Sequence, residues 1–496
     1  MLWIWQRKSN NIHDLNSTVW DEWADADGSI GKAYGYQLGV KHQYKEGMMD
    51  QVDRVTYDLK NNPFSRRIMT NIYVHADLYI VGRFHGVAET TAVSVGSQIM
   101  HFVTVMIVGL AMGSTVTIGK AIGACDKQKC AKAIGNTITL FIIVAVISML
   151  VLLFRVDPIV GVMSTPEKAV AGTTQYLIIC FIGIPFITAY NIISAIFRGM
   201  GDSKSPMYFI GIACLCNIGL DYLLIGGFHM GAAGAALGTT LSQTISVIVS
   251  LIAIRKKQMG IQFGKKDLIP NKEMMAELLL IGTPVALQDG FIQVAFLFIT
   301  VIANRRGIND AAAVGIVEKI ISLVFLVPSS MLSTVSAISS QNIGAGYHDR
   351  ARKTLQYCIT IAVSYGALMI VLIEPFAPGV VGLFTKNAAA RVLGGQYLRG
   401  YIIDAMIAGV HFCFSGYFCA YGLSSISFAH NVASMLFIRI PGSYFMSKWF
   451  ADTLMPMGLA APAGSLLSVV ICVIAYLLLQ HYWMKRESID LNRTSC

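Results

Sequence analysis

Charged residues are scarce in this sequence. Only 13% of its 496 residues are Asp, Glu, Lys or Arg, whereas 55% are hydrophobic and the mean hydropathy is +0.59. Soluble globular domains carry roughly 25% charged residues, so this composition excludes that class and indicates a membrane protein. The net charge of +10 arises entirely after residue 76. A basic excess in an apolar chain is typical of cytoplasmic loops rather than of nucleic-acid binding.

Cysteine is absent before Cys125, and the ten cysteines of the chain are scattered mostly through apolar segments. Only Cys214 and Cys216 are close together, and alternate residues of a helix face different directions. Neither a disulfide framework nor a metal site is therefore indicated. We also expect no signal peptide, because the apolar start of the chain breaks at Arg7 and Lys8 before a long apolar core forms.

Apolar stretches close to the roughly 20 residues that cross a bilayer recur along most of the chain. We expect eleven spans, near residues 95–119, 133–155, 170–195, 205–227, 232–254, 276–301, 313–339, 354–375, 397–421, 427–449 and 462–484. Alternate loops between these spans are basic, which predicts that those loops and the C-terminus are cytoplasmic. Arg305 and Arg306 fall on the opposite side and are the one clear exception.

The second half of the chain repeats the first at an offset of 221 positions. Identical residues at this offset are 122–124 and 343–345, 132 and 353, 176–177 and 397–398, and 197, 201 and 203 with 418, 422 and 424. Several matches at one spacing through apolar segments indicate a duplicated membrane bundle.

The same offset predicts a transmembrane helix over residues 55–80 that the sequence does not support. The segment contains the charged residues Asp58, Lys60, Arg66 and Arg67. Without a partner, each of these charges would cost about 3 kcal/mol in the hydrocarbon core. Only residues 77–82 have the character of a helix end. We therefore expect the first helix to be largely missing and the first half to be poorly formed.

Five segments resemble the multidrug and toxic compound extrusion (MATE) transporters. They are DLYIVGR at 77–83, IGKAIGA at 118–124, FRGMGDSKSP at 197–206, and NIGLDYLLIGG at 217–227 followed by MGAAGAALGTTLSQ at 230–243. The resemblance runs from about residue 77 to residue 487, is specific, and is closest to staphylococcal-type multidrug exporters. It implies two six-helix lobes around a central cleft, here residues 77–260 and 261–496, and export driven by inward proton or sodium flow.

Residues 1–76 resemble an internal fragment of thymidylate synthase, through residues 16–37 and 50–78. In that family a pair matching Arg66 and Arg67 grips a nucleotide phosphate, which suits the planar guanidinium. The fragment lacks the family's nucleophilic cysteine, since the first cysteine is Cys125. As a truncated piece cut from a larger sheet, it is also not expected to fold alone. We therefore expect no enzyme activity and a vestigial phosphate site. The junction lies at residues 75–78, as a genuine fusion, a recombination scar or an assembly error.

Asp221 lies in the middle of an apolar stretch, one helical turn from Asn217 and on the same face. The resemblance implies that these two residues line a cation site together with Asp77 and Thr239. Buried carboxylates suit reversible proton binding, and two carboxylates with an amide and a hydroxyl equally suit sodium. The alternative is that Asp221 caps or hydrogen-bonds a neighbouring helix. Apart from this coupling ion, no cofactor is expected.

The second half offers its own intramembrane polar residues. Gln288 is expected to donate or accept hydrogen bonds in the substrate cleft, and Asp289 beside it is a candidate cleft carboxylate. Asp404 is a candidate proton or cationic-substrate site, although Arg399 five residues away offers a salt bridge instead. We expect Arg439 to pack against backbone carbonyls or a carboxylate in the cleft.

These observations predict an all-α polytopic protein of a bacterial plasma membrane, a monomeric, damaged or chimeric MATE-type antiporter that exports organic cations or amphiphilic drugs. Three alternatives remain. A lipid or oligosaccharide flippase of the same broad fold would have a cleft rich in Arg and Lys, whereas carboxylates outnumber bases at membrane depth here. A non-functional chimera needs only the missing helix. A pyrimidine-nucleotide methyltransferase would need the absent cysteine.

Overall fold

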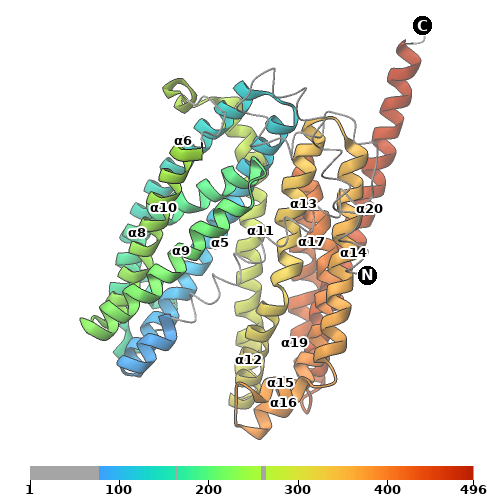
Figure 1. Ribbon diagram of the computed structural model, residues 1–496. Helices are drawn as coiled ribbons and strands as arrows, with labels where there is room; N and C mark the ends of the chain where they lie inside the picture. The colour runs from blue at the N-terminus through green and yellow to red at the C-terminus, as the bar shows by residue number, and fades with distance from the viewer. Residues whose placement is uncertain (1–76, 164, 258–263, 495–496) are drawn as a thin grey trace, which may run out of the picture.

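The computed structural model describes residues 77–163, 165–257 and 264–494, and within these ranges the secondary structure is helical, with no strand. Two bundles of helices lie side by side (Figure 1). The first bundle comprises residues 77–84, α5 (Val87–Gly123), α6 (Lys127–Phe154), α7 (Val156–Val162), α8 (Glu167–Gly199), α9 (Lys204–Asp221), η1 (Tyr222–Gly227) and α10 (Gly231–Lys257).

The second bundle follows a short turn, η2 (Lys265–Leu268). It comprises α11 (Lys272–Arg306), α12 (Ile308–Val324), α13 (Leu326–Gly344), α14 (His348–Ile373), α15 (Ala377–Gly382), α16 (Ala388–Ile402), α17 (Asp404–Tyr421), α18 (Ser424–Ser434), η3 (Met435–Arg439), α19 (Ile440–Trp449) and α20 (Met455–Thr494). The fold is therefore the predicted all-α, two-bundle arrangement.

Nine helices of the described chain are long and apolar enough to span a membrane, and the pair α12 and α13, bent by 41°, makes up to ten. These ten include every predicted span except 427–449. That segment is also helical, but it divides into α18, the π-helix η3 and α19, and it carries the buried residues His430, Asn431 and Arg439. Its division into three short helices separates it from the continuous spans.

The predicted duplication is visible in corresponding helix ends. Gly201 follows α8 with φ 83°, and Gly422 ends α17 with φ 82°. Both lie in the left-handed region that glycine adopts without a Cβ clash. The same polar contact also recurs at the same offset: the Thr115 hydroxyl donates to the carbonyl of Ala195 at 3.2 Å, and the Ser336 hydroxyl donates to the carbonyl at position 416 at 3.1 Å.

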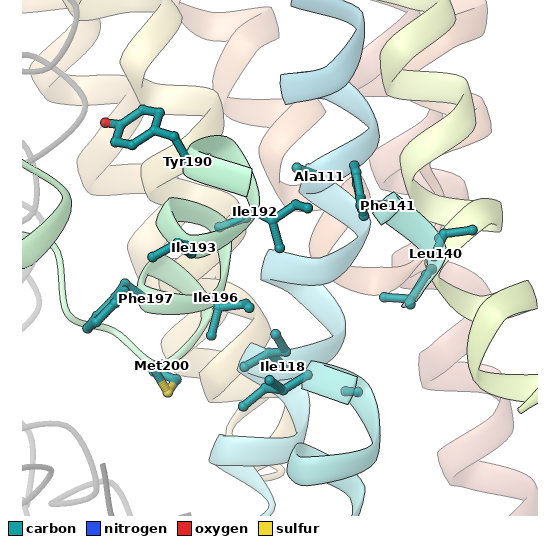
Figure 2. Close-up of a cluster of buried hydrophobic side chains, with 14 of the residues drawn as sticks. Ala111, Ile118, Leu140, Phe141, Tyr190, Ile192, Ile193, Ile196, Phe197 and Met200 are labelled. Carbon is teal, nitrogen blue, oxygen red and sulfur yellow. The ribbon is translucent and has the colours of Figure 1, made fainter. Parts of the chain in front are cut away.

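The first bundle is well packed, so the expectation of a poorly formed first half is wrong for the described residues. One buried cluster joins α5, α6 and α8 (Figure 2), where Phe141, Phe197 and Ile118 are at most 1% exposed. A second cluster includes Val81, just before α5, and Phe181 of α8. Close packing of this kind, rather than water exclusion, holds helices together in a bilayer. The predicted gap over residues 55–80 lies, except for its last four residues, outside the described residues.

The two bundles meet through reciprocal glycine contacts. A Cβ on Gly123 of α5 would overlap the carbonyl oxygen of Gln341 in α13, and a Cβ on Gly344 of α13 would overlap the carbonyl oxygen of Lys120 in α5. The two contacts are related by the 221-residue offset, so an approximate two-fold axis passes between them. Figure 1 shows the bundles close together at this end and diverging toward residues 77–84 and α12.

The contact end of the molecule is the basic end. Lys120 lies in the last turn of α5 and Lys127 and Lys129 lie in the first turn of α6, and the C-terminal end of α20 lies at the same end in Figure 1. By the positive-inside rule this end faces the cytoplasm. The structure therefore has its bundles together at the cytoplasmic end and apart at the outer end.

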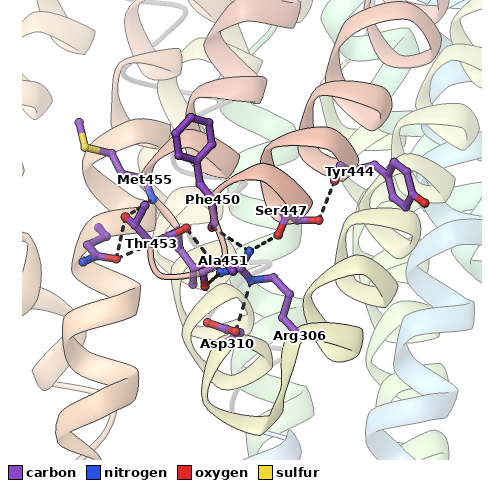
Figure 3. Close-up of polar contacts among 10 residues, drawn as sticks. Arg306, Asp310, Tyr444, Ser447, Phe450, Ala451, Thr453 and Met455 are labelled. Carbon is purple, nitrogen blue, oxygen red and sulfur yellow. Dashed lines mark hydrogen bonds and ion pairs between the residues drawn. The ribbon is translucent and has the colours of Figure 1, made fainter.

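Arg306, one of the two basic residues predicted on the outer side, has a local structural role (Figure 3). Its guanidinium donates to the carbonyls of Ser447, Phe450 at 3.2 Å and Ala451 at 2.7 Å, and it pairs with Asp310 at 3.3 Å. Arg306 thus satisfies carbonyl groups left unpaired where α19 ends. This contact accounts for a basic residue on the outer side.

Candidate functional site

The four predicted cation-site residues come together in the first bundle. Asp77 lies in the helix at 77–84, Asn217 and Asp221 lie on α9, and Thr239 lies on α10. The Thr239 hydroxyl donates to Oδ2 of Asp77 at 3.3 Å, and the Asn217 amide donates to Oδ1 of Asp221 at 3.4 Å. The Asp77 and Asp221 carboxylates are also close enough to interact electrostatically. Three separate helical segments therefore converge on one pair of carboxylates.

This site is closed off from its surroundings. Asp77 is 5% exposed, and Asn217 and Asp221 are 0% exposed. Oδ1 of Asp77, Oδ1 of Asn217 and Oδ2 of Asp221 have no hydrogen-bond partner among the described residues. Leaving buried acceptors unsatisfied is costly. Two carboxylates this close also repel each other unless a proton or a cation lies between them.

The backbone geometry changes at Asp221. The α-helix α9 ends at this residue, and the π-helix η1 begins at Tyr222. Asp221 makes no capping hydrogen bond there, and its hydrogen bond is to Asn217 on its own helix. The alternative that Asp221 serves as a helix cap is therefore not supported. Single π-turns inside α-helices are frequent at functional sites.

The second bundle encloses a different polar cluster. Arg439 approaches Oδ2 of Asp404 at 3.8 Å, donates to the Tyr401 hydroxyl, and lies 5.2 Å from the centre of the Phe296 ring. Asp404 is 0% and Arg439 is 7% exposed. The structure thus places both residues inside the second bundle, where the acid and the base form an ion pair. Tyr401 was not predicted, although it lies one turn before Asp404.

The pairing differs from one sequence-based alternative. Arg399 donates to the backbone carbonyl of Glu374 at 3.3 Å, whereas Asp404 pairs with Arg439. The helix is interrupted between α16, which ends at Ile402, and α17, which begins at Asp404. The regular helical spacing is therefore broken between these two residues. Arg399 and Asp404 do not form the salt bridge that the sequence offered as an alternative.

Gln288 is not on an open cleft surface. Its side chain is 0% exposed, and its Oε1 accepts a hydrogen bond from the Ser427 hydroxyl at 2.7 Å. This bond ties α11 to α18 within the second bundle. Asp289 is half-buried and lies close enough to Cys419 to interact with it electrostatically. The predicted cleft roles of both residues stay predictions.

Aromatic and sulfur-containing side chains line the region where α5 and α11 face each other. Phe102 and Met106 of α5 come within 3.8 Å of a Cβ placed on Gly290 of α11. Phe291 of α11 is 43% exposed and packs edge-on against Phe428 of α18, with ring centres 5.9 Å apart. Phe291 is therefore the exposed member of a group of aromatic and methionine side chains beside the contact of α5 with α11.

Comparison with protein-family models identifies the family of this two-bundle protein. The model of the MatE family matches residues 65–223 and 284–445, one match in each bundle. The chain belongs to the MatE family. The match includes Asp77, Asn217 and Asp221 of the first polar cluster and all of the second cluster, whereas Thr239 lies between the two matched ranges.

Individual MatE relatives cover most of the chain. The sequence is 26% identical to "Probable multidrug resistance protein YoeA" of Bacillus subtilis over 82% of this chain and 89% of the relative. It is 25% identical to "Multidrug export protein MepA" of Staphylococcus aureus over 86% and 92%. A solved "Outward-facing conformation of a multidrug resistance MATE family transporter of the MOP superfamily" superposes with a TM-score of 0.82, at 20% identity, over 89% of this chain and 98% of that structure.

A second family model, thymidylate synthase, matches residues 1–87 and so overlaps the MatE match over residues 65–87. Arg66 and Arg67 lie in this overlap and outside the described residues. The thymidylate synthase match ends at residue 87, whereas the MatE match extends over helices of both bundles. The protein is therefore a multi-pass membrane transporter of the plasma membrane and not an enzyme.

Proposed function

We propose that this MatE protein exports amphiphilic or cationic drugs from the cytoplasm, driven by inward flow of a cation that binds between Asp77 and Asp221. The observation that carries this proposal is the buried carboxylate pair, in which one oxygen of each acid and the adjacent amide oxygen of Asn217 have no hydrogen-bond partner among the described residues. Oxygen atoms are the ligands of hard cations, and the same atoms can hold a proton. The names of the relatives YoeA and MepA support drugs as the cargo.

The proposed cargo path runs beside the aromatic and methionine side chains where α5 and α11 face each other. Phe102, Met106 and Phe291 present polarizable side chains there, and such side chains accommodate varied apolar and cationic molecules. Asp289 is the proposed carboxylate that favours positive cargo. We assign transport to residues 77–260 and 261–496 as two lobes, and no activity to residues 1–76.

The test uses the full-length chain in a bacterial host that lacks its own drug pumps. Cells that express the protein should accumulate less ethidium than cells with empty vector, and collapse of the proton or sodium gradient should remove the difference. Asp221→Asn should insert normally and fail to export, whereas Asp452→Asn, at an exposed outer residue, should export like wild type. Absence of efflux by an inserted, full-length protein would overturn the proposal.

The coupling ion is identified separately in proteoliposomes. A sodium gradient and a pH gradient of equal driving force are imposed one at a time, and drug movement is recorded under each. The gradient that drives drug transport identifies the coupling ion as sodium or the proton. If neither gradient drives a transporter that still exchanges drug, the cation-coupling part of the proposal fails while drug transport stands.

A further inference from the structure

α10 contains a glycine that faces the cation site directly. A Cβ on Gly238 would overlap Oδ1 of Asp221, would lie 3.3 Å from the Asp221 Cγ, and would lie 3.5 Å from the amide nitrogen of Asn217. The Asp221 carboxylate therefore occupies the space that any larger residue at position 238 would fill. Asp221 is 0% exposed, so its carboxylate cannot avoid the larger residue by turning into solvent.

The next residue of α10 contacts the other carboxylate. Thr239 donates its hydroxyl to Oδ2 of Asp77 at 3.3 Å. Two consecutive residues, Gly238 and Thr239, thus fix the two acids by different means: one leaves a space for Asp221, and the other supplies a hydrogen bond to Asp77. With Oδ1 of Asp221 held against α10, its Oδ2 is the oxygen left without a partner.

We propose that Gly238 is a positioning residue for the cation site: the space at position 238 holds Asp221 against α10 and sets its separation from Asp77. This inference rests on the proposed cation coupling for its function, although the contact itself does not. A methyl group at position 238 would push the carboxylate away from α10. Cation sites lose affinity when their ligands are displaced, because the ligands must converge on one point.

The test compares Gly238→Ala with Gly219→Ala in the purified full-length protein. Gly219 lies on α9 between Asn217 and Asp221, and a Cβ there would meet no atom within 4 Å. The thermal midpoint of each protein is measured across a pH series and a sodium series. Gly238→Ala should lose at least half of the ion-dependent rise in midpoint, and Gly219→Ala should keep all of it. An ion-dependent rise in Gly238→Ala equal to that of wild type would overturn the proposal.

A double-mutant cycle tests the contact even if Gly238→Ala folds poorly. Asp221→Ala removes the carboxylate that the new methyl group would strike. Gly238→Ala should therefore lower the thermal midpoint in the wild-type background and have little effect in the Asp221→Ala background. An equal penalty in both backgrounds would show that position 238 does not act through Asp221, and would overturn the inference. If wild type shows no ion-dependent rise while the cycle shows coupling, the cation proposal fails and the positioning contact stands.

Discussion

The first bundle buries two acids against each other, with Asn217 and Thr239 as their polar neighbours, whereas the second bundle buries Asp404 against Arg439. At the repeat offset the counterpart of Asp404 is Gly183, and the counterpart of Asp221 is Gly442. Each polar cluster is nevertheless next to a π-helix in the corresponding helix, η1 or η3. The duplicated halves thus retained their packing and acquired different charges.

The two polar clusters are expected to have different roles: the acid pair in ion coupling and the ion pair in the stability of the fold. An acid pair without a neutralising base attracts a cation, and an acid paired with an arginine already has its counter-charge. We therefore expect substitutions at the acid pair to abolish transport and substitutions at the ion pair mainly to destabilise the fold. Five experiments test this contrast, in order of decreasing expected effect.

The largest effect is expected at the acid pair. Asp77→Asn and Asp221→Asn each remove a charge from the cation site, and coupled efflux should fall at least about tenfold, since loss even of an outer-shell partner costs that much affinity. Thermal stability should change little. The measurement is initial drug efflux per inserted molecule, with Asp452→Asn as the control. Wild-type rates in both variants would remove the functional distinction between the bundles.

The ion pair should respond in the opposite way. Asp404→Asn leaves Arg439 buried without its carboxylate and should cost about 3 kcal/mol of unfolding free energy. The double variant Asp404→Asn with Arg439→Met removes both charges and should recover most of that loss. Thermal unfolding in detergent gives the comparison. A normally stable Asp404→Asn protein that cannot transport would instead make the second bundle a coupling site.

The glycine contact between the bundles should show an intermediate effect. Gly344→Ala forces a methyl group against the Lys120 carbonyl, and overpacking of this kind costs about 2 kcal/mol. We expect weaker closure of the cytoplasmic end and greater labelling of a Val116→Cys reporter from that side. Val116 is 0% exposed in the apolar cluster between the bundles. Gly315→Ala, at a helix position with open space, should leave the labelling of the reporter unchanged.

A smaller effect is expected at the outer end. Arg306→Ala removes charge-assisted hydrogen bonds to carbonyls near the end of α19 and should lower stability by about 1.5 kcal/mol. Transport per folded molecule should stay the same. Arg305→Ala is the matched control, because Arg305 is adjacent and exposed. Equal destabilisation by the two variants would contradict the role assigned to Arg306.

No effect on transport is expected from the thymidylate-synthase-like segment. Arg66→Ala with Arg67→Ala in the full-length chain should export ethidium at the wild-type rate, since the proposed machinery begins at Asp77. The measurement is efflux per inserted molecule. A large loss of efflux with normal insertion would make this segment part of the transporter.

The sequence predicted local geometry well and long-range pairing poorly. Asn217 and Asp221 could be placed together because they are one helical turn apart, and the family resemblance added Asp77 and Thr239. The partner of Asp404 could not be found in this way, since Arg439 is distant in the sequence and the turns of α16 end before Asp404. Helical spacing also could not show that Gln288 accepts a hydrogen bond from Ser427 of α18.

The space at Gly238 escaped prediction for a related reason. An isolated glycine in an apolar helix has many explanations, such as close packing of backbones. The structure shows that the carboxylate of Asp221, on a neighbouring helix, lies where a side chain at position 238 would be. The prediction of a poorly formed first half was wrong for a similar reason. The packing of α5, α6 and α8 depends on complementary helix surfaces, which the amino-acid composition does not reveal.

The reciprocal glycine contact has the form of a homodimer interface inside a single polypeptide. Such an interface is isologous: the same patch is used twice, so one change in an unduplicated gene would alter both sides together. Here Gly123 and Gly344 are encoded separately, and each can change alone. The two sides of the contact can therefore acquire unequal strengths, and a transporter of this kind can adjust how readily it opens inward through a single codon.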